Sequence, residues 1–138
     1  MNRYKTNRLW DINVNIVAAD IVSTAGTALI IQALQTRLPT PLAIVTVTAI
    51  VDGAISLAVF ACLHTYANRA RGMRDLMRVQ LHRWALSPLH YLVGIALQFA
   101  LLAAGVGAGI GVLVAYLSAV AVARTVHTLY GRKSGLFR

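Results

Sequence analysis

Two of the four acidic residues, Asp20 and Asp52, stand inside long apolar segments. A charge within hydrocarbon costs several kcal/mol unless it is paired or hydrated, so an ionisable residue in such a segment is a candidate for function. Asp20 lies about 10 Å from the start of its segment, at about 1.5 Å per helical residue, and Arg124 lies at a similar depth in another segment. The two could form a buried ion pair, which would either serve function or only fix the register of two helices.

Asp52 lies near the middle of the apolar segment 41–66, with no basic residue at matching depth. The polar residues that could donate a hydrogen bond to it are Gln98, Tyr116 and Ser118. A protonatable acid in the middle of a membrane suits proton-coupled transport. It suits equally a structural acid with satisfied hydrogen bonds or an interface with a partner subunit, so the role of Asp52 is open at this point.

The basic residues gather where the apolar segments end. All but one of the 13 Lys and Arg residues fall in three clusters, at residues 3–8, 69–83 and 124–138, and the exception is Arg37. Guanidinium groups bind phosphate through paired hydrogen bonds, so the clusters suit an anionic headgroup, a phosphate or a diphosphate, at one membrane surface. The candidate ligands are Arg69, Arg71, Arg74, Arg78, Arg132 and Lys133. Any membrane protein with basic cytoplasmic segments carries such arginines, which leaves topology alone as the second explanation.

Two histidines, His64 and His127, stand near the ends of two different apolar segments. At one level near a membrane surface they could ligate a haem iron, a metal or a pigment from two sides. No CxxCH motif and no second pair of ligands accompany them, and the single cysteine, Cys62, permits no cysteine-based metal cluster within one chain. Because boundary histidines also hydrogen-bond lipid headgroups, we predict no cofactor and no metal.

Four apolar segments must position these residues, and their lengths are those of membrane-spanning helices. The chain is 58% hydrophobic, and a bilayer core of ~30 Å takes about 20 helical residues to cross. The expected spans cover residues 13–34, 41–66, 89–105 and 108–130. We therefore predict an all-α integral membrane protein. We attribute the net charge of +9 to topology and anionic lipids and expect no nucleic-acid binding.

Turn-forming residues connect these spans in two pairs. Pro39 and Pro41 interrupt the helical pattern after the first span, and a glycine-rich stretch, residues 105–109, does so after the third. Connections this short make each pair an antiparallel hairpin. Because basic segments stay on the cytoplasmic side, both termini and the middle linker are predicted to be cytoplasmic, and Arg37 is predicted to face outward.

The basic linker between the hairpins, residues 69–88, has an apolar face at helical spacing. The members of this face are Met73, Leu76, Met77, Leu81 and Trp84. The pattern predicts an amphipathic helix in the headgroup plane, with Pro88 before the third span, and an ordinary charged loop is the alternative. Residues 1–138 then form a single membrane domain, with hairpin 1 at about 9–68 and hairpin 2 at about 89–131.

The second and fourth spans end alike, which indicates either a duplicated two-helix repeat or a coincidence between two membrane boundaries. The two stretches are His64-Thr65-Tyr66-Ala67-Asn68-Arg69 and His127-Thr128-Leu129-Tyr130-Gly131-Arg132-Lys133, the latter followed by Leu136-Phe137. The chain size, the paired hairpins and these ends resemble the GtrA-like family of small four-span bacterial membrane proteins. A duplicated member of another two-span family is the alternative.

The resemblance implies a location in the bacterial inner membrane and a role in cell-surface polysaccharide or glycolipid synthesis. The protein would handle a polyprenyl-phosphate-linked sugar on its way across the membrane, with an anionic or polyprenyl-phosphate lipid as its partner. The sequence contains no nucleotide-binding loop and no HExxH motif, so we do not predict an enzyme. The second hypothesis is a small structural or accessory subunit of a homo-oligomer or a larger membrane complex, with a haem or pigment bound to histidine as a variant.

Overall fold

The chain folds into four long α-helices, seen in a computed structural model that describes residues 3–67 and 72–133. The helices are α1 (Arg3–Leu34), α2 (Pro41–Ala67), α3 (Gly72–Ala103) and α4 (Ala108–Lys133), with a short 3-10 turn, η1 (Gln35–Arg37), after α1. The prediction of an all-helical protein is confirmed, and the described residues form four α-helices.

Three of these helices are long and apolar enough to cross a membrane, which indicates a membrane protein. Their apolar segments are Val14–Arg37, Pro41–Leu63 and Ala108–Val126. The span expected at residues 89–105 corresponds to a shorter apolar stretch, Ser87–Ala103, in the second half of α3. A helix needs about 20 residues to cross the hydrocarbon core of a bilayer, with a lower limit of about 17, so this stretch is at the short end of the range.

A glycine motif ends α3. Gly105 has a φ of 80°, a backbone conformation that residues with a side chain rarely adopt. The amide of Gly105 donates to the carbonyl of Leu102, and the amide of Val106 donates to the carbonyl of Leu101, both at 3.0 Å. These two bonds satisfy carbonyl groups at the helix end in the pattern of a Schellman motif, so the chain turns at once and α4 begins at Ala108.

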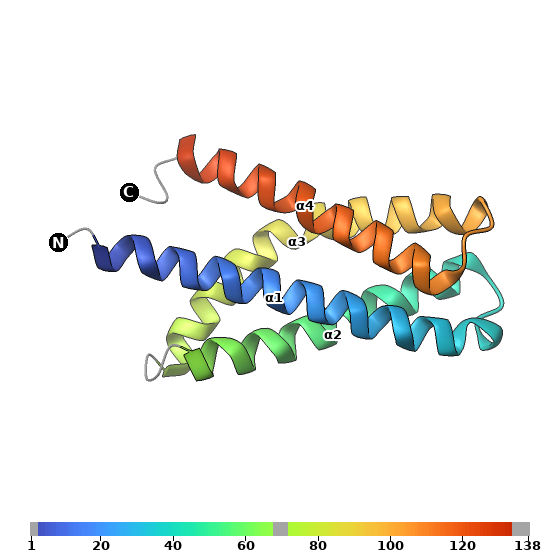
Figure 1. Cartoon of the computed structure of the whole chain (residues 1–138), viewed down its shortest axis with the longest axis horizontal. Helices are drawn as coiled ribbons and strands as arrows, with labels where there is room; N and C mark the ends of the chain where they lie inside the picture. Colours follow the sequence, from blue (N-terminus) through green and yellow to red (C-terminus); the bar gives the residue numbers. More distant parts are fainter. Residues whose placement is uncertain (1–2, 68–71, 134–138) are drawn as a thin grey trace.

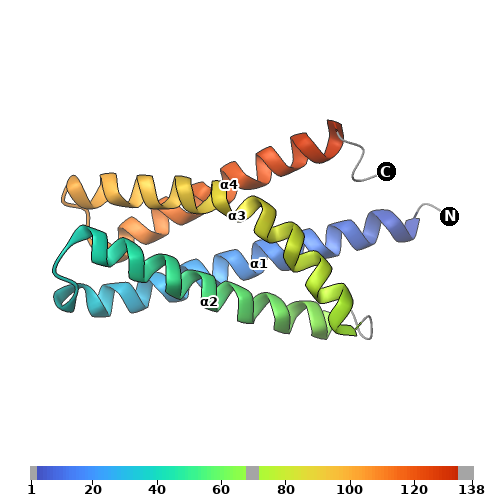
Figure 2. The same cartoon turned by 180° about the vertical axis from the view of Figure 1, so that it is seen from behind.

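Each helix has two principal neighbours, since α1 packs on α2 and α4, and α3 packs on α4 and α2. The connections from α1 to α2 and from α3 to α4 lie together at one end of the bundle (Figure 1). The start of α1, the end of α2, the start of α3 and the end of α4 lie at the opposite end, which Figure 2 shows from behind. We call this second end the basic end, because most helix-borne Lys and Arg residues belong to the helix portions nearest to it.

The predicted amphipathic linker is not a separate helix. Its described part is the beginning of α3, which starts at Gly72 and continues through Pro88 into the apolar stretch, while residues 69–71 lie outside the described residues. Proline removes one backbone hydrogen bond and crowds the preceding turn, which kinks a helix without having to end it. Accordingly, α3 changes direction partway along its length, and its first half crosses obliquely from the end of α2 (Figure 2).

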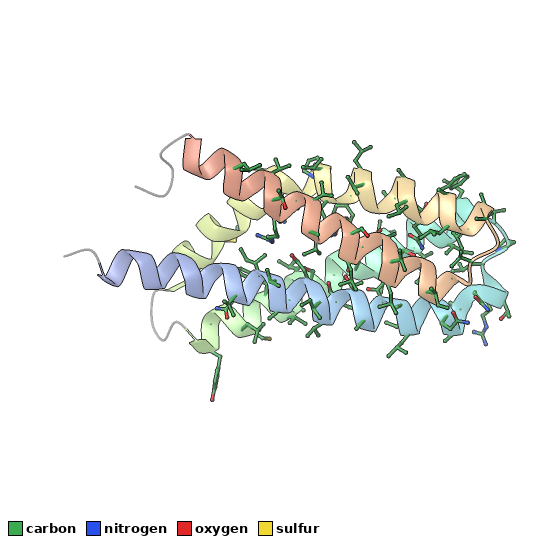
Figure 3. All side chains as sticks on the ribbon, turned by 45° about the horizontal axis from the view of Figure 1, so that its top comes forward. Atoms are coloured by element: carbon green, nitrogen blue, oxygen red, sulfur yellow. The ribbon has the colours of Figure 1, made fainter. Side chains whose placement is uncertain are left out.

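The bundle interior combines an apolar core, with residues such as Ile31, Phe60 and Val112, and several buried polar residues, whereas its outside exposes many large apolar side chains. Most side-chain atoms drawn in Figure 3 are carbon, and large apolar side chains such as Leu29, Leu42, Leu92 and Ile110 are exposed. The buried polar residues are Ser23, Thr24, Thr27, Thr48, Asp52, Ser56 and Gln98. Water-soluble bundles expose few large apolar side chains in contiguous patches, so this outer surface is the one expected where hydrocarbon surrounds the helices.

Candidate functional site

Polar residues at helical spacing on α1 and α2 create a polar seam between these two helices. On α1 they are Asp20, Ser23, Thr24 and Thr27, and on α2 they are Thr48, Asp52 and Ser56. Residues three or four apart share one face of a helix, so each set forms a stripe along its helix. Because α1 packs directly on α2, the two stripes meet in the interior, and residues of α3 and α4 complete the site.

Three helices contribute to the first group of the site, which is centred on Asp20. Arg124 of α4 donates from Nη2 to Asp20 Oδ2 at 3.0 Å, and Ser56 of α2 donates from Oγ to Asp20 Oδ1 at 3.2 Å. The side chains of Asp20 and Arg124 are 13% and 25% exposed, so the ion pair is mostly shielded. The structure thus brings together the acid and the base that the sequence places at similar depths, and it adds a hydroxyl donor.

The second group is centred on Asp52, whose side chain is almost completely buried, with the residue only 2% exposed. Ser23 of α1 donates from Oγ to Asp52 Oδ1 at 2.9 Å, and the same hydroxyl lies 3.0 Å from the backbone oxygen of Asp20. On the other side, His90 Nε2 of α3 lies 3.9 Å from Asp52 Oδ2. Asp52 therefore links three helices and has an ionisable neighbour.

The expectation that Asp52 has no basic residue at matching depth is wrong. Because α3 continues through Pro88, its apolar stretch begins at Ser87 and His90 enters the bundle instead of lying at the membrane boundary. Gln98 lies two helical turns further along α3, and its Nε2 donates to Thr48 Oγ1 at 2.9 Å. The signals that the sequence reading missed were Ser23, one turn after Asp20 on α1, and the position of His90 two residues after a kinking proline.

Two tyrosines surround the imidazole of His90. The centroids of the Tyr91 and Tyr116 rings lie 5.2 and 5.6 Å from that of His90, each in an edge-to-face arrangement. Glycines make room for both phenol rings. A Cβ atom at Gly53 would lie 2.9 Å from the Tyr91 hydroxyl, and one at Gly94 would lie 3.3 Å from the Tyr116 ring.

Several buried polar atoms of the bundle interior have no hydrogen-bond partner among the described residues. They include the Oε1 atom of Gln98, the hydroxyl of Tyr116 and the hydroxyls of Thr24 and Thr27. An unsatisfied buried polar group costs about 1–3 kcal/mol. The interior therefore contains hydrogen-bonding capacity that the described residues do not satisfy.

At the end opposite to the basic end, a side chain of α1 and one of η1 bind the first turn of α4. The amide of Gly109 donates to Gln32 Oε1 at 3.0 Å, and the amide of Ala108 donates to Gln35 Oε1 at 3.4 Å. The first amides of a helix have no partner within the helix, so these two glutamines serve as caps supplied by another helix. These two hydrogen bonds fix the register of α4 against α1, and this register determines the position along the helices at which Arg124 meets Asp20.

The predicted phosphate-binding residues cannot be placed as a site. Arg69 and Arg71 lie outside the described residues, as do the side chains of Arg74, Arg78, Arg132 and Lys133. The side chains of His64 and His127 also lie outside the described part of the chain. The backbone places positions 74 and 78 in the first half of α3 and positions 132 and 133 at the end of α4, toward the basic end.

The arrangement holds two acids inside apolar helices in different ways: Asp20 has a cation beside it, whereas Asp52 has a hydroxyl donor and a histidine. No protein-family model matches the chain, and no curated protein or solved structure shows significant similarity to it.

Proposed function

We propose that this protein spans a bacterial inner membrane four times, as two antiparallel hairpins with both termini in the cytoplasm, and handles a polyprenyl-phosphate-linked sugar there. The observation that carries the proposal is the distribution of polarity along and around the bundle. Large apolar side chains cover the outside, ionisable groups occupy the interior, and basic residues gather toward one end. A membrane protein that receives an anionic headgroup at its cytoplasmic surface needs all three features.

The positions of the basic residues support the proposed orientation. Those on described helix backbone near the basic end are residues 3, 5, 8, 74, 78, 132 and 133, whereas Arg37 belongs to η1 at the opposite end. Cytoplasmic segments of membrane proteins are enriched in Lys and Arg. The basic end is accordingly the cytoplasmic end in this proposal.

The first half of α3 supports a function at the lipid headgroups. Met77 and Trp84 stand seven residues apart, hence on one face, and both side chains are about half exposed. Arg74 and Arg78 belong to the same half of α3. An oblique helix with an exposed apolar face and nearby arginines suits the boundary between acyl chains and phosphates. The resemblance to GtrA-like proteins supplies the identity of the phosphate, a polyprenyl-linked sugar.

The alternative function, an accessory subunit of a membrane complex, is favoured by a different observation. Ala96, Ala100 and Ala104 follow at intervals of four residues, and all three are exposed. Small residues at this spacing let transmembrane helices approach closely. The outer face of α3 would then pack against a second copy of the chain or against another membrane protein.

Native mass spectrometry of the protein, gently extracted from its own membrane, tests both functions. We expect a bound polyprenyl-phosphate lipid that is lost when Arg69 or Arg132 is replaced by alanine. Arg37→Ala is the matched control, because it removes one positive charge from the opposite end of the molecule. A stoichiometric larger assembly without such a lipid would overturn the carrier function and favour the subunit.

A further inference from the structure

The two buried acids differ in what neutralises them. Asp20 has the permanently charged guanidinium of Arg124 at 3.0 Å. For Asp52, the basic group that the described residues supply is the imidazole of His90, with Nε2 3.9 Å from Oδ2. Arginine keeps its proton under all physiological conditions, whereas carboxylates and imidazoles both exchange protons. Of the two pairs, only Asp52 and His90 therefore form one in which both partners can gain or lose a proton.

We propose that Asp52 and His90 form one proton-binding site in the interior of the bundle. The pair carries no net charge when the single proton between them resides on either partner. A further proton, or the loss of that proton, leaves one net charge in apolar surroundings, where an isolated charge is costly. The proton occupancy of this site is thereby linked to the hydration and packing of the helices around it.

Ionisable groups on α1, α3 and α4 lie around the Asp52–His90 pair, and they leave this pair as the site that exchanges protons. From α1 the titratable neighbour is Asp20, and from α4 it is Arg124, and these two neutralise each other. Among the described residues, the other ionisable groups beside the pair are the phenols of Tyr91 on α3 and Tyr116 on α4. Both ring centroids lie within about 6 Å of the His90 ring, so the two phenol rings pack directly against the imidazole.

A line of hydroxyl groups leads from this site toward the basic end. The Ser23 hydroxyl is shared between Asp52 Oδ1 and the backbone oxygen of Asp20, at 2.9 and 3.0 Å. One turn further along α2, Ser56 donates to the Asp20 carboxylate. The Ser23 hydroxyl thereby joins Asp52 to the backbone of α1 at Asp20, and it holds the two acids at neighbouring levels of the bundle.

This inference rests on the membrane insertion of the proposed function, but it does not depend on the identity of the transported lipid. If the protein moves a lipid-linked sugar, the pair supplies a site through which that movement can be linked to the proton gradient. The expected behaviour of the pair is the same if the protein is a subunit of a larger complex.

The experiment is a titration of the histidine ring nitrogens by NMR, with ¹⁵N-histidine protein in lipid nanodiscs over about pH 5–8. His90→Gln assigns the signal of His90. We expect Asp52→Asn to change the proton affinity of His90 by about tenfold or more, because Asn keeps an acceptor for Ser23 but removes the acid. Ser56→Ala is the control, since Ser56 is bonded to Asp20, and we expect a change below about twofold.

A change below about twofold in a folded Asp52→Asn protein would overturn the proton site. If that variant does not fold, Ser23→Ala decides, because it removes only the hydroxyl bonded to Asp52 Oδ1. We expect it to alter the His90 titration more than Ser56→Ala does, and equal effects would also overturn the proposal. Native mass spectrometry of the same samples separates the two proposals. If the lipid is retained but Asp52→Asn leaves the His90 titration unchanged, only the proton site is refuted. If Asp52→Asn changes the His90 titration but no lipid is bound, only the proposed substrate is refuted.

Discussion

A double-mutant cycle on Asp20 and Arg124 measures whether the ion pair between α1 and α4 stabilises the fold. The variants are Asp20→Asn, Arg124→Gln and the double substitution. The pair is a direct contact of 3.0 Å, with side-chain exposures of 13% for Asp20 and 25% for Arg124. Exposed pairs contribute about 0–1 kcal/mol, whereas breaking a buried pair costs about 3–5 kcal/mol. The partial exposure places this pair between the two limits.

The two single substitutions should differ in their effect. Asp20→Asn removes the carboxylate from beside a guanidinium that cannot lose its proton, and we expect it to lower the free energy of unfolding by about 2–3 kcal/mol. Arg124→Gln leaves Asp20 with the hydroxyl of Ser56 at 3.2 Å, so we expect a smaller cost of about 1–2 kcal/mol. The double variant retains no charge at either position and should cost about 1 kcal/mol or less.

With a cost of about 1 kcal/mol for the double variant, these values give a coupling energy of about 2–4 kcal/mol, which is on the order of a hundredfold or more in the unfolding equilibrium. The assay is reversible unfolding by SDS in mixed micelles, followed by far-ultraviolet circular dichroism, with the free energy of unfolding compared among all four proteins. If the effects of the two single substitutions add to within about 0.5 kcal/mol, Asp20 and Arg124 do not stabilise the fold as a pair, because independent sites are additive in this way.

Two further substitutions test the packing of the interior in the same unfolding assay. Gly109→Ala places a Cβ 2.7 Å from Gln32 Oε1 and 3.1 Å from a backbone oxygen, so we expect the free energy of unfolding to fall by about 2 kcal/mol. At Gly107 a Cβ meets nothing within 4 Å, so Gly107→Ala should change the free energy of unfolding by less than about 0.5 kcal/mol. Equal effects would contradict the contact. Gln98→Leu removes one hydrogen bond to Thr48 together with an unpaired buried oxygen, and we expect a change within about 1 kcal/mol. A loss above about 2 kcal/mol would mean that this oxygen has a bound partner.

The helix ends at the two connections could be predicted from the sequence because the features that determine them are local, whereas α1 and α3 begin well before the expected spans. Apolar length, proline and glycine act within a few residues, and they place the breaks at residues 35–40 and 104–107. The depth of a residue along a straight helix follows from its rise per residue, and for this reason Asp20 and Arg124 could be matched by counting. The same counting failed for α3, where a proline inside an apolar helix either ends or kinks it, and only packing selects between the two.

The partners of Asp52 were decided by tertiary structure. Ser23 and His90 reach this acid because of the rotation of α1 and α3 about their own axes and the register of each against α2. A shift of one residue turns a helix by about 100° and would direct other side chains inward. The sequence by itself determined which residues are polar and how deep they lie along each helix. Only the packed bundle decided which of them meet, because contacts between helices depend on surfaces that residues distant in sequence build together.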